Sequence, residues 1–280
     1  MLDTVAFYGA RAGTVAALNI AGLADQHVTV QGNNIIVPTP CNKILSAFAC
    51  SQATAGSLTN NVTISSPSLR ARSLVELSNH NANGAVVAAA QIPDNNAPYN
   101  DFKESPIQLT TGEALQALSA VDVAAVAENI FLILTLTDGN VDLPEAFRGA
   151  PIETVIADGQ AAAVINTWSP SALVFRQALR AGTYAVVGMK STGTSCVASR
   201  LVFGNQGARP GVIGTNSPVG AAGVGSFADS VDQLNGMMRY GRMGVLGYFT
   251  NTNPPQMETI CSVADAAITQ HVALDIVKVA

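Results

Sequence analysis

Charge is scarce in this 280-residue chain: Asp, Glu, Lys and Arg together make up 12% of it, against about 25% in an ordinary soluble domain. Intrinsic disorder is excluded, because disordered chains combine high charge with low hydrophobicity and this chain has the reverse. A genome-coating protein is excluded as well, since 14 basic against 19 acidic residues give a net charge of −5 and no basic surface. Few charges leave a neutral exterior that is prone to association, so the composition favours a protein that covers its surface with neighbours.

Long apolar runs are also missing, although the mean hydropathy is positive at +0.30. A membrane-spanning helix needs about 20 consecutive apolar residues, and the best stretch, 121–136, is interrupted by Asp122, Glu128 and Asn129. Residues 1–5 lack the basic-then-apolar order of a secretory signal. We therefore expect no transmembrane segment and no signal peptide.

Residues that carry chemistry are few and without pattern. The three histidines do not form a zinc motif, and neither a GxSxG elbow nor a phosphate-binding loop is present. His27 and His271 lie beside or within strand-like runs, where a structural role is expected, and His80 lies in an expected turn. The four cysteines have no CxxC spacing and are expected to be small buried side chains; they are Cys41, Cys50, Cys196 and Cys261. We predict no catalytic, cofactor-binding or metal-binding residue and no cofactor, and therefore a protein that is not an enzyme.

Helix-forming surface residues are rare too, with four Lys and seven Glu in the whole chain. A layered α/β enzyme covers the outer faces of its helices with such residues, so that architecture is excluded. Short runs rich in Val, Ile, Thr, Phe and Tyr, separated by clusters of Asn, Gly, Pro and Ser, indicate strands and turns instead. The expected strands are 27–30, 34–37, 61–64, 183–187, 243–250 and 271–279. The pattern predicts a mostly β protein, a sandwich or a barrel.

Two short helices are expected. Residues 111–119 have a polar cap followed by good helix formers, and residues 228–238 form the second candidate. We expect both to connect strands rather than to build a layer of their own.

One sequence echo indicates that the chain is duplicated. Residues 46–57 align with residues 171–183 when one residue is inserted, and the register continues so that Ser65 meets Ser191. Chance matching is the alternative, because Ala, Ser and Gly are abundant in this chain.

A second echo follows in the same order. Residues 119–124 resemble residues 262–267, and each copy precedes a strongly apolar stretch, 130–137 in one case and 272–279 in the other. Two echoes in one order favour duplication over chance.

Duplication predicts two modules, residues 1–145 and 146–280, joined by the acidic, proline-marked stretch 138–151. Two eight-stranded modules leave about 12 residues for each loop when strands have about 5–6 residues. Segments 93–106 and 204–226, rich in Asn, Pro and Gly, are expected to be the long loops. Two tandem eight-stranded jelly rolls fit this arithmetic.

With its two echoed halves, a terminal apolar strand in each, and a neutral composition without catalytic motifs, the chain resembles the double jelly-roll major capsid proteins of tailless icosahedral viruses, the lineage of adenovirus hexon and several bacteriophages. The resemblance covers the full length and rests on architecture, because no short motif defines that lineage. It implies a structural protein of the virion. Homotrimers with a pseudo-hexameric outline would contact neighbouring capsomers and other virion proteins, such as penton or membrane proteins, without binding nucleic acid directly.

Charge is unevenly placed along the chain. Eleven acids lie between Asp94 and Asp158 against two bases, and seven bases lie between Arg176 and Arg242 against two acids. In a shell, the two modules would attract each other head to tail around a ring. The alternative is that neighbouring positions share solvated loops, where ion pairs contribute little.

Two other functions stay open at this stage. A β-sandwich module that binds carbohydrate, or an adhesin, would need exposed aromatic side chains, for which segment 99–102 and Tyr240 are the candidates. A hydrolase on a β scaffold would need paired carboxylates, such as Glu104 and Glu113.

A calcium site is a further open question. Asp138, Asn140 and Asp142 have the spacing that begins a calcium-binding loop. The sixth and twelfth positions of that loop would be Leu143 and Gly149 rather than Gly and Glu, so a plain acidic turn is the competing interpretation.

Overall fold

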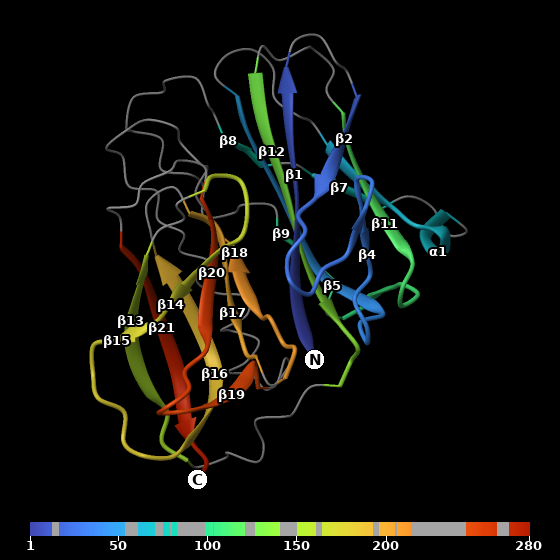
Figure 1. The fold of residues 1–280 in the computed structure, drawn as a ribbon. Helices are drawn as coiled ribbons and strands as arrows, with labels where there is room; N and C mark the ends of the chain where they lie inside the picture. The colour runs from blue at the N-terminus through green and yellow to red at the C-terminus, as the bar shows by residue number, and fades with distance from the viewer. Residues whose placement is uncertain are drawn as a thin grey trace. The chain divides into compact units, whose positions relative to one another are not determined.

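The computed structural model describes residues 1–12, 17–53, 61–70, 75–78, 80–82, 99–102, 104–120, 127–140, 150–160, 164–192, 196–204, 206–213, 245–261 and 269–280. The chain divides into two compact units. The N-terminal unit contains the described part of residues 3–139, and the C-terminal unit contains that of residues 140–280 together with Met1 and Leu2. In Figure 1 the N-terminal unit runs from blue to green and the C-terminal unit from yellow to red.

Strands dominate both units, so the predicted mostly β class is confirmed. Their sheets are antiparallel apart from the pair of β5 and β8, which is parallel in the described part. The one helix in the described ranges is α1 (Pro67–Arg70). No described helix has the length and apolarity that crossing a bilayer requires.

The N-terminal unit contains two groups of four neighbouring strands. Its strands are β1 (Leu2–Ala12), β2 (Ala17–Gly22), β3 (Val30–Gln31), β4 (Asn34–Ile36), β5 (Lys43–Ala53), β6 (Asn61–Ser65), β7 (Val75–Ser78), β8 (His80–Ala82), β9 (Tyr99–Asp101), β10 (Ile107–Gln108), β11 (Ala114–Ala120) and β12 (Ala127–Thr137). One group has the order β10-β5-β12-β1 and the other has the order β2-β11-β6-β7. Because β1 also pairs with β2, with Phe7 opposite Gly22, the two groups form one continuous sheet.

The core of this unit lies along β12. Every second side chain of that strand belongs to the apolar core; these are Ile130, Leu132, Leu134 and Leu136. On the opposite face of the strand, Phe131 and Ile133 have no exposed surface either. A strand that is buried on both faces favours apolar residues at successive positions, which explains the apolar run 130–134 in its sequence.

The C-terminal unit has two separate sheets. Its strands are β13 (Glu153–Gln160), β14 (Ser169–Ala172), β15 (Val174–Phe175), β16 (Thr183–Thr192), β17 (Cys196–Val202), β18 (Gly211–Ile213), β19 (Gly247–Thr250), β20 (Gln256–Cys261) and β21 (Thr269–Lys278). Five strands form a sheet in the order β15-β13-β21-β16-β19, and four form the second in the order β14-β20-β17-β18.

The two sheets of this unit pack closely at glycine positions. A Cβ atom added at Gly159 of β13 would lie 2.9 Å from Met257 Cε of β20, so that face of β13 meets the second sheet. At Gly247 of β19 an added Cβ would lie 2.7 Å from the ring of Phe203. Because side chains alternate along a strand, residues 154, 156 and 158 project from the opposite, outer face of β13.

Four of the predicted strands are confirmed: the runs 34–37, 61–64, 183–187 and 271–279 coincide with β4, β6, β16 and β21, although β4 and β21 end one residue earlier, at Ile36 and Lys278. The run 243–250 is strand from Gly247 onward, and residues 243–244 lie outside the described residues. The run 27–30 is strand only at Val30. The Asp25 carboxylate accepts the backbone N–H groups of His27 at 2.6 Å and Val28 at 2.7 Å, and this turn replaces the expected strand.

The helix predicted at 111–119 is wrong, because this segment forms a turn followed by strand β11. There Ala117 lies opposite Ile20 of β2 on one side and Ile64 of β6 on the other. Backbone pairing on both sides, together with an alternation in which Leu115 is buried and Leu118 is exposed, outweighs local helix propensity. The second predicted helix, 228–238, lies outside the described residues.

The two sequence echoes differ in how they correspond to the observed strands. Residues 46–53 belong to β5, whereas residues 171–183 run through β14, β15 and a turn, so the first echo does not join equivalent strands. The apolar stretches after the second echo are β12 and β21, the last strand of each unit. Most of that echo's own residues lie outside the described ranges.

Candidate functional site

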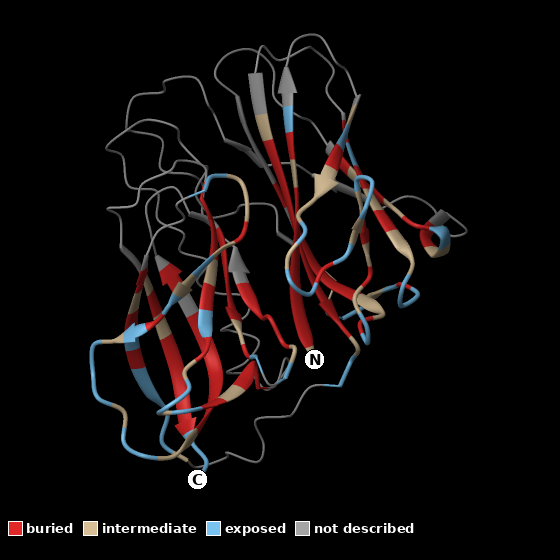
Figure 2. Ribbon diagram, in the orientation of Figure 1, coloured by how far each residue is buried: buried red, intermediate tan, exposed pale blue. Residues whose placement is uncertain are grey.

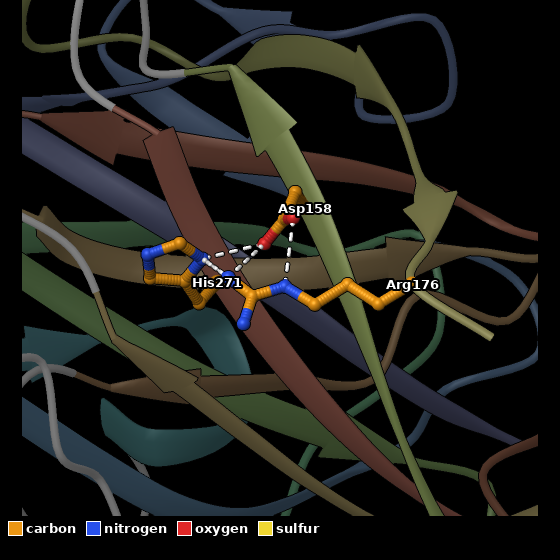
Figure 3. A network of polar contacts seen from close by, with 3 residues as sticks. All are labelled: Asp158, Arg176 and His271. Atoms are coloured by element: carbon orange, nitrogen blue, oxygen red, sulfur yellow. Dashed lines mark hydrogen bonds and ion pairs between the residues drawn. The ribbon is translucent and has the colours of Figure 1, made fainter.

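Three polar side chains meet on the outer face of the five-stranded sheet in the C-terminal unit (Figure 3). Asp158 of β13 lies directly opposite His271 of β21 and, on its other side, opposite Val174 of β15. Arg176 follows β15 immediately. Since directly opposite residues of an antiparallel pair project to the same face, strand register alone brings these groups together. We refer to Asp158, Arg176 and His271 as the Asp158 cluster.

The cluster is held by short, charge-assisted contacts. Arg176 Nε donates to Asp158 Oδ2 and Arg176 Nη2 donates to Asp158 Oδ1, each at 2.9 Å. His271 Nδ1 lies 2.6 Å from Asp158 Oδ1 and 3.1 Å from Arg176 Nη2. Figure 3 shows the guanidinium and the imidazole reaching the carboxylate from the two neighbouring strands. The two-point contact matches the planar fork of Arg to both carboxylate oxygens.

These contacts stabilise the ionised carboxylate. Hydrogen bonds from Arg176 first, and from His271 second, lower the pKa of Asp158 from its ordinary value of 3.8 to about 2. The same hydrogen bond to Asp158 raises the pKa of Arg176. Asp158 and Arg176 are therefore both charged at neutral pH and neutralise each other.

The position of the histidine proton follows from the geometry. An ionised carboxylate only accepts hydrogen bonds, so at 2.6 Å Nδ1 of His271 donates to Asp158. The same nitrogen then cannot accept from Arg176 Nη2, and their 3.1 Å approach is a contact between two donors. An Asp–His pair of this kind is two-thirds of a catalytic triad. Within the described ranges, no hydroxyl or thiol is hydrogen-bonded to His271.

Exposed apolar side chains surround the cluster. Ile156 shares the outer face of β13 with Asp158 and is 37% exposed, and Val174 on β15 is 68% exposed. Ile152, which precedes β13, is 55% exposed. Figure 2 shows exposed segments in pale blue along β13. Ile156 and Val174 thus place exposed β-branched groups next to the ion pair on one face of the sheet.

A second charged pair lies inside the four-stranded sheet of this unit. Arg200 of β17 has no exposed surface, and its Nε donates to Glu258 Oε2 of β20 at 2.7 Å. The Arg200 guanidinium carbon also lies 4.0 Å from the centre of the Trp168 ring, a cation–π geometry. Because Arg200 is buried, this pair serves the fold rather than binding a ligand.

Three of the seven bases between Arg176 and Arg242 are paired or buried in the described part of the chain. Arg176 is neutralised by Asp158, the last acid of the acidic stretch. Arg200 and Arg209 are buried, so they cannot attract a neighbouring module. The hypothesis of head-to-tail attraction stays a prediction, since Arg239 and Arg242 lie outside the described residues.

The other histidines have no part in this cluster. His27 is exposed in the turn before β3. His80 begins the short strand β8, opposite Cys50 of β5, so the turn expected there is wrong. Of the cysteines, Cys41 and Cys261 are buried free thiols, as predicted.

Most of the described residues that were candidates for carbohydrate binding or for hydrolysis have structural roles. Phe102 packs against the apolar core of the N-terminal unit, which removes it from any exposed aromatic platform, and Tyr240 lies outside the described residues. Both carboxylate oxygens of Glu113 accept backbone N–H groups, from Thr110 at 2.7 Å and from Ser68 at 3.0 Å. Glu104 is exposed in a loop, and nothing places it as a partner of Glu113.

Two of the three residues with calcium-loop spacing, Asp138 and Asn140, lie in the described part of the chain. Asp138 follows β12, and the Asn140 carbonyl accepts a hydrogen bond from the terminal amino group of Met1. Asp142 lies outside the described residues. Within the described ranges, no group of three His, Cys, Asp or Glu side chains is placed to hold a metal ion.

Comparison with known proteins assigns no relative. No family model matches this chain, and no curated protein is similar to it in sequence. Function is therefore argued from the architecture and from the Asp158 cluster.

Sequence reasoning did not find the Asp158 cluster. Asp158 and His271 are 113 positions apart, and only the register of β13 with β21 places them opposite each other. The sequence did contain one signal. Polar residues recur at alternate positions in the runs that form β13 and β21, and such alternation indicates a strand with one uncovered face. Which runs pair, and in which register, cannot be taken from that alternation.

Proposed function

We propose that this protein is a structural subunit that assembles with copies of itself into a closed shell, as the major capsid protein of an icosahedral virus does. We also propose that each unit is an eight-stranded jelly roll. The strand order supports the jelly-roll proposal, and the composition supports the shell-subunit proposal.

Strand order is the observation that carries the proposal. When β15 is set aside, eight strands remain in the C-terminal unit, and we number them 1 to 8 in chain order. Strands 1, 8, 3 and 6 are then neighbours in one sheet (β13-β21-β16-β19), and strands 2, 7, 4 and 5 are neighbours in the other (β14-β20-β17-β18). The N-terminal unit has the same order in β1-β12-β5-β10 and β2-β11-β6-β7, when β3, β4, β8 and β9 are set aside. A jelly roll alternates its strands between two sheets in this way.

A jelly roll alone does not specify a function, since lectins and cupins share it with capsid proteins. Two copies in one chain, a charged fraction of 12% and an exposed apolar face beside a neutral ion cluster favour assembly over binding of a small ligand. A shell subunit needs such neutral contact surfaces on several sides. The expected state is a homotrimer with a pseudo-hexameric outline, located in the virion.

Sedimentation velocity and electron microscopy of the purified full chain test the proposal. We expect trimers that grow into larger rings or closed particles as protein concentration or salt rises. A monomer at every concentration and salt condition would refute a self-assembling shell protein.

A further inference from the structure

Two cysteines occupy opposite positions on neighbouring strands of the C-terminal unit. Cys196 begins β17 and Cys261 ends β20, and these two strands lie side by side in the four-stranded sheet (Figure 1). In their antiparallel ladder, Cys196 lies directly opposite Cys261. Directly opposite positions of such a pair share one face of the sheet, so strand pairing makes neighbours of two cysteines that are far apart in the sequence.

An irregularity in the ladder produces this pairing. Ala198 lies opposite Ile260, so a regular register would place Val197 opposite Cys261. The register instead shifts between Cys196 and Ala198, and Cys196 takes that place. Shifts of this kind re-aim strand positions and are specific features of a fold rather than defects.

Backbone hydrogen bonding indicates that the two positions are close enough for a covalent bond. The Cys261 carbonyl accepts a hydrogen bond from the backbone N–H of Asn166 at 2.9 Å, on the side of β20 where β14 lies. The N–H and C=O groups of one strand residue point to the same side, so Cys196 and Cys261 form a non-hydrogen-bonded pair of the β17–β20 ladder. Opposite Cα atoms at such positions are about 4.5 Å apart, and disulfides usually join Cα atoms about 4.4–6.8 Å apart.

We propose that Cys196 and Cys261 are a redox-sensitive pair that forms a disulfide when the chain meets a small-molecule disulfide such as oxidised glutathione. One cysteine thiolate attacks a sulfur of oxidised glutathione, which gives a mixed disulfide and releases one glutathione thiolate. The second cysteine thiolate attacks the protein sulfur of that mixed disulfide and releases the second glutathione thiolate. The two protein thiols thus lose two electrons and two protons, and one glutathione disulfide becomes two glutathione thiols.

The bond would lock two strands of the C-terminal unit together. Cys261 is buried, but the pair lies where β17 begins and β20 ends, and strand ends open more readily than strand centres. Small thiols keep the pair reduced in a reducing compartment, and transfer to an oxidising medium closes it. Because a disulfide between distant positions restricts the unfolded chain, oxidation should stabilise the unit. The inference goes beyond the proposed function and does not depend on assembly, since it concerns a single chain.

The test incubates the full chain with oxidised glutathione and, in parallel, with reduced glutathione. After acid quenching, the remaining thiols are blocked with a maleimide in denaturant, and peptide mass spectrometry identifies linked cysteines. C196A and C261A each remove one member of the pair. C41A is the matched control, because Cys41 is also a buried cysteine but belongs to the N-terminal unit.

We expect a peptide that links Cys196 to Cys261 after oxidation, with two of the four cysteines left for the maleimide, in the unaltered chain and in C41A alike. Oxidation should raise the melting temperature of both by at least about 5 °C, and C196A and C261A should abolish that rise. If C261A does not fold, C196A decides.

Two results would overturn the proposal. If all four cysteines react with the maleimide after oxidation, or if Cys196 is linked to a partner other than Cys261, the redox pair is refuted. If the link forms but the melting temperature does not rise, the stabilising lock is refuted. Either failure leaves the shell function standing, and a chain that stays monomeric leaves the redox pair standing.

Discussion

Replacing Glu258 by Gln removes the negative charge that faces the buried guanidinium of Arg200 while it preserves the shape of the side chain. Arg200 has no exposed surface, and the Glu258 side chain is 14% exposed. Loss of one partner of a buried ion pair costs about 3–5 kcal/mol, because the remaining charge stays out of water. We expect a value near the lower end, about 3 kcal/mol, since Arg200 also lies over the Trp168 ring. That loss lowers the folding equilibrium constant roughly hundredfold.

Trp168 makes this prediction measurable at the site itself. It is the single tryptophan of the chain, so its fluorescence during urea denaturation reports the unfolding of the C-terminal unit around Arg200. Protein concentration is held below the onset of association, because assembly adds to apparent stability. Glu153→Gln, at the exposed start of β13, is the control and should change stability by no more than about 0.5 kcal/mol. A cost below about 1 kcal/mol for Glu258→Gln would show that the Arg200 charge does not depend on Glu258.

Two further predictions concern the same unit. Gly247→Ala should destabilise it by about 1–3 kcal/mol, seen as a lower melting temperature, because the new Cβ would lie 2.7 Å from the Phe203 ring; an unchanged melting temperature would contradict this packing. Carbon NMR titration should give Asp158 a pKa of about 2. Arg176→Gln should raise that pKa toward 3.8 by more than His271→Gln does, because the hydrogen bond from Arg176 is the larger cause, and the opposite order would contradict the geometry. Since the folded-state pKa is depressed, the stability that the cluster contributes is fully present above about pH 3.8 and is lost as the pH falls toward 2.

Some features of this protein follow from local sequence alone. The mostly β class follows from short β-branched runs between Asn, Gly, Pro and Ser clusters, and strands β4, β6, β16 and β21 lie where those runs lie. The apolar run 130–134 marks a central strand, because a strand covered on both faces favours apolar residues at successive positions. The burial of Cys41 and Cys261 follows from spacings that exclude a metal or redox motif.

Other features were decided by contacts between distant segments. Residues 114–120 are good helix formers, but they became strand β11 because β2 and β6 offer backbone partners on both sides. The first sequence echo was misleading for a related reason: similarity in Ala, Ser and Gly carries no information about which strands pair.

The Asp158 cluster depended most on tertiary structure. Arg176 lies 18 positions after Asp158 in the sequence, and His271 lies 113 positions after it. A shift of one residue in the register of β13 with β21 would move Asp158 or His271 to the opposite face of the sheet. Composition determined that this protein has a neutral exterior, since a charged fraction of 12% cannot cover it with ions. Which part of that exterior stays open was decided by strand order and register, because burial depends on what packs against a face and not on the residues within it.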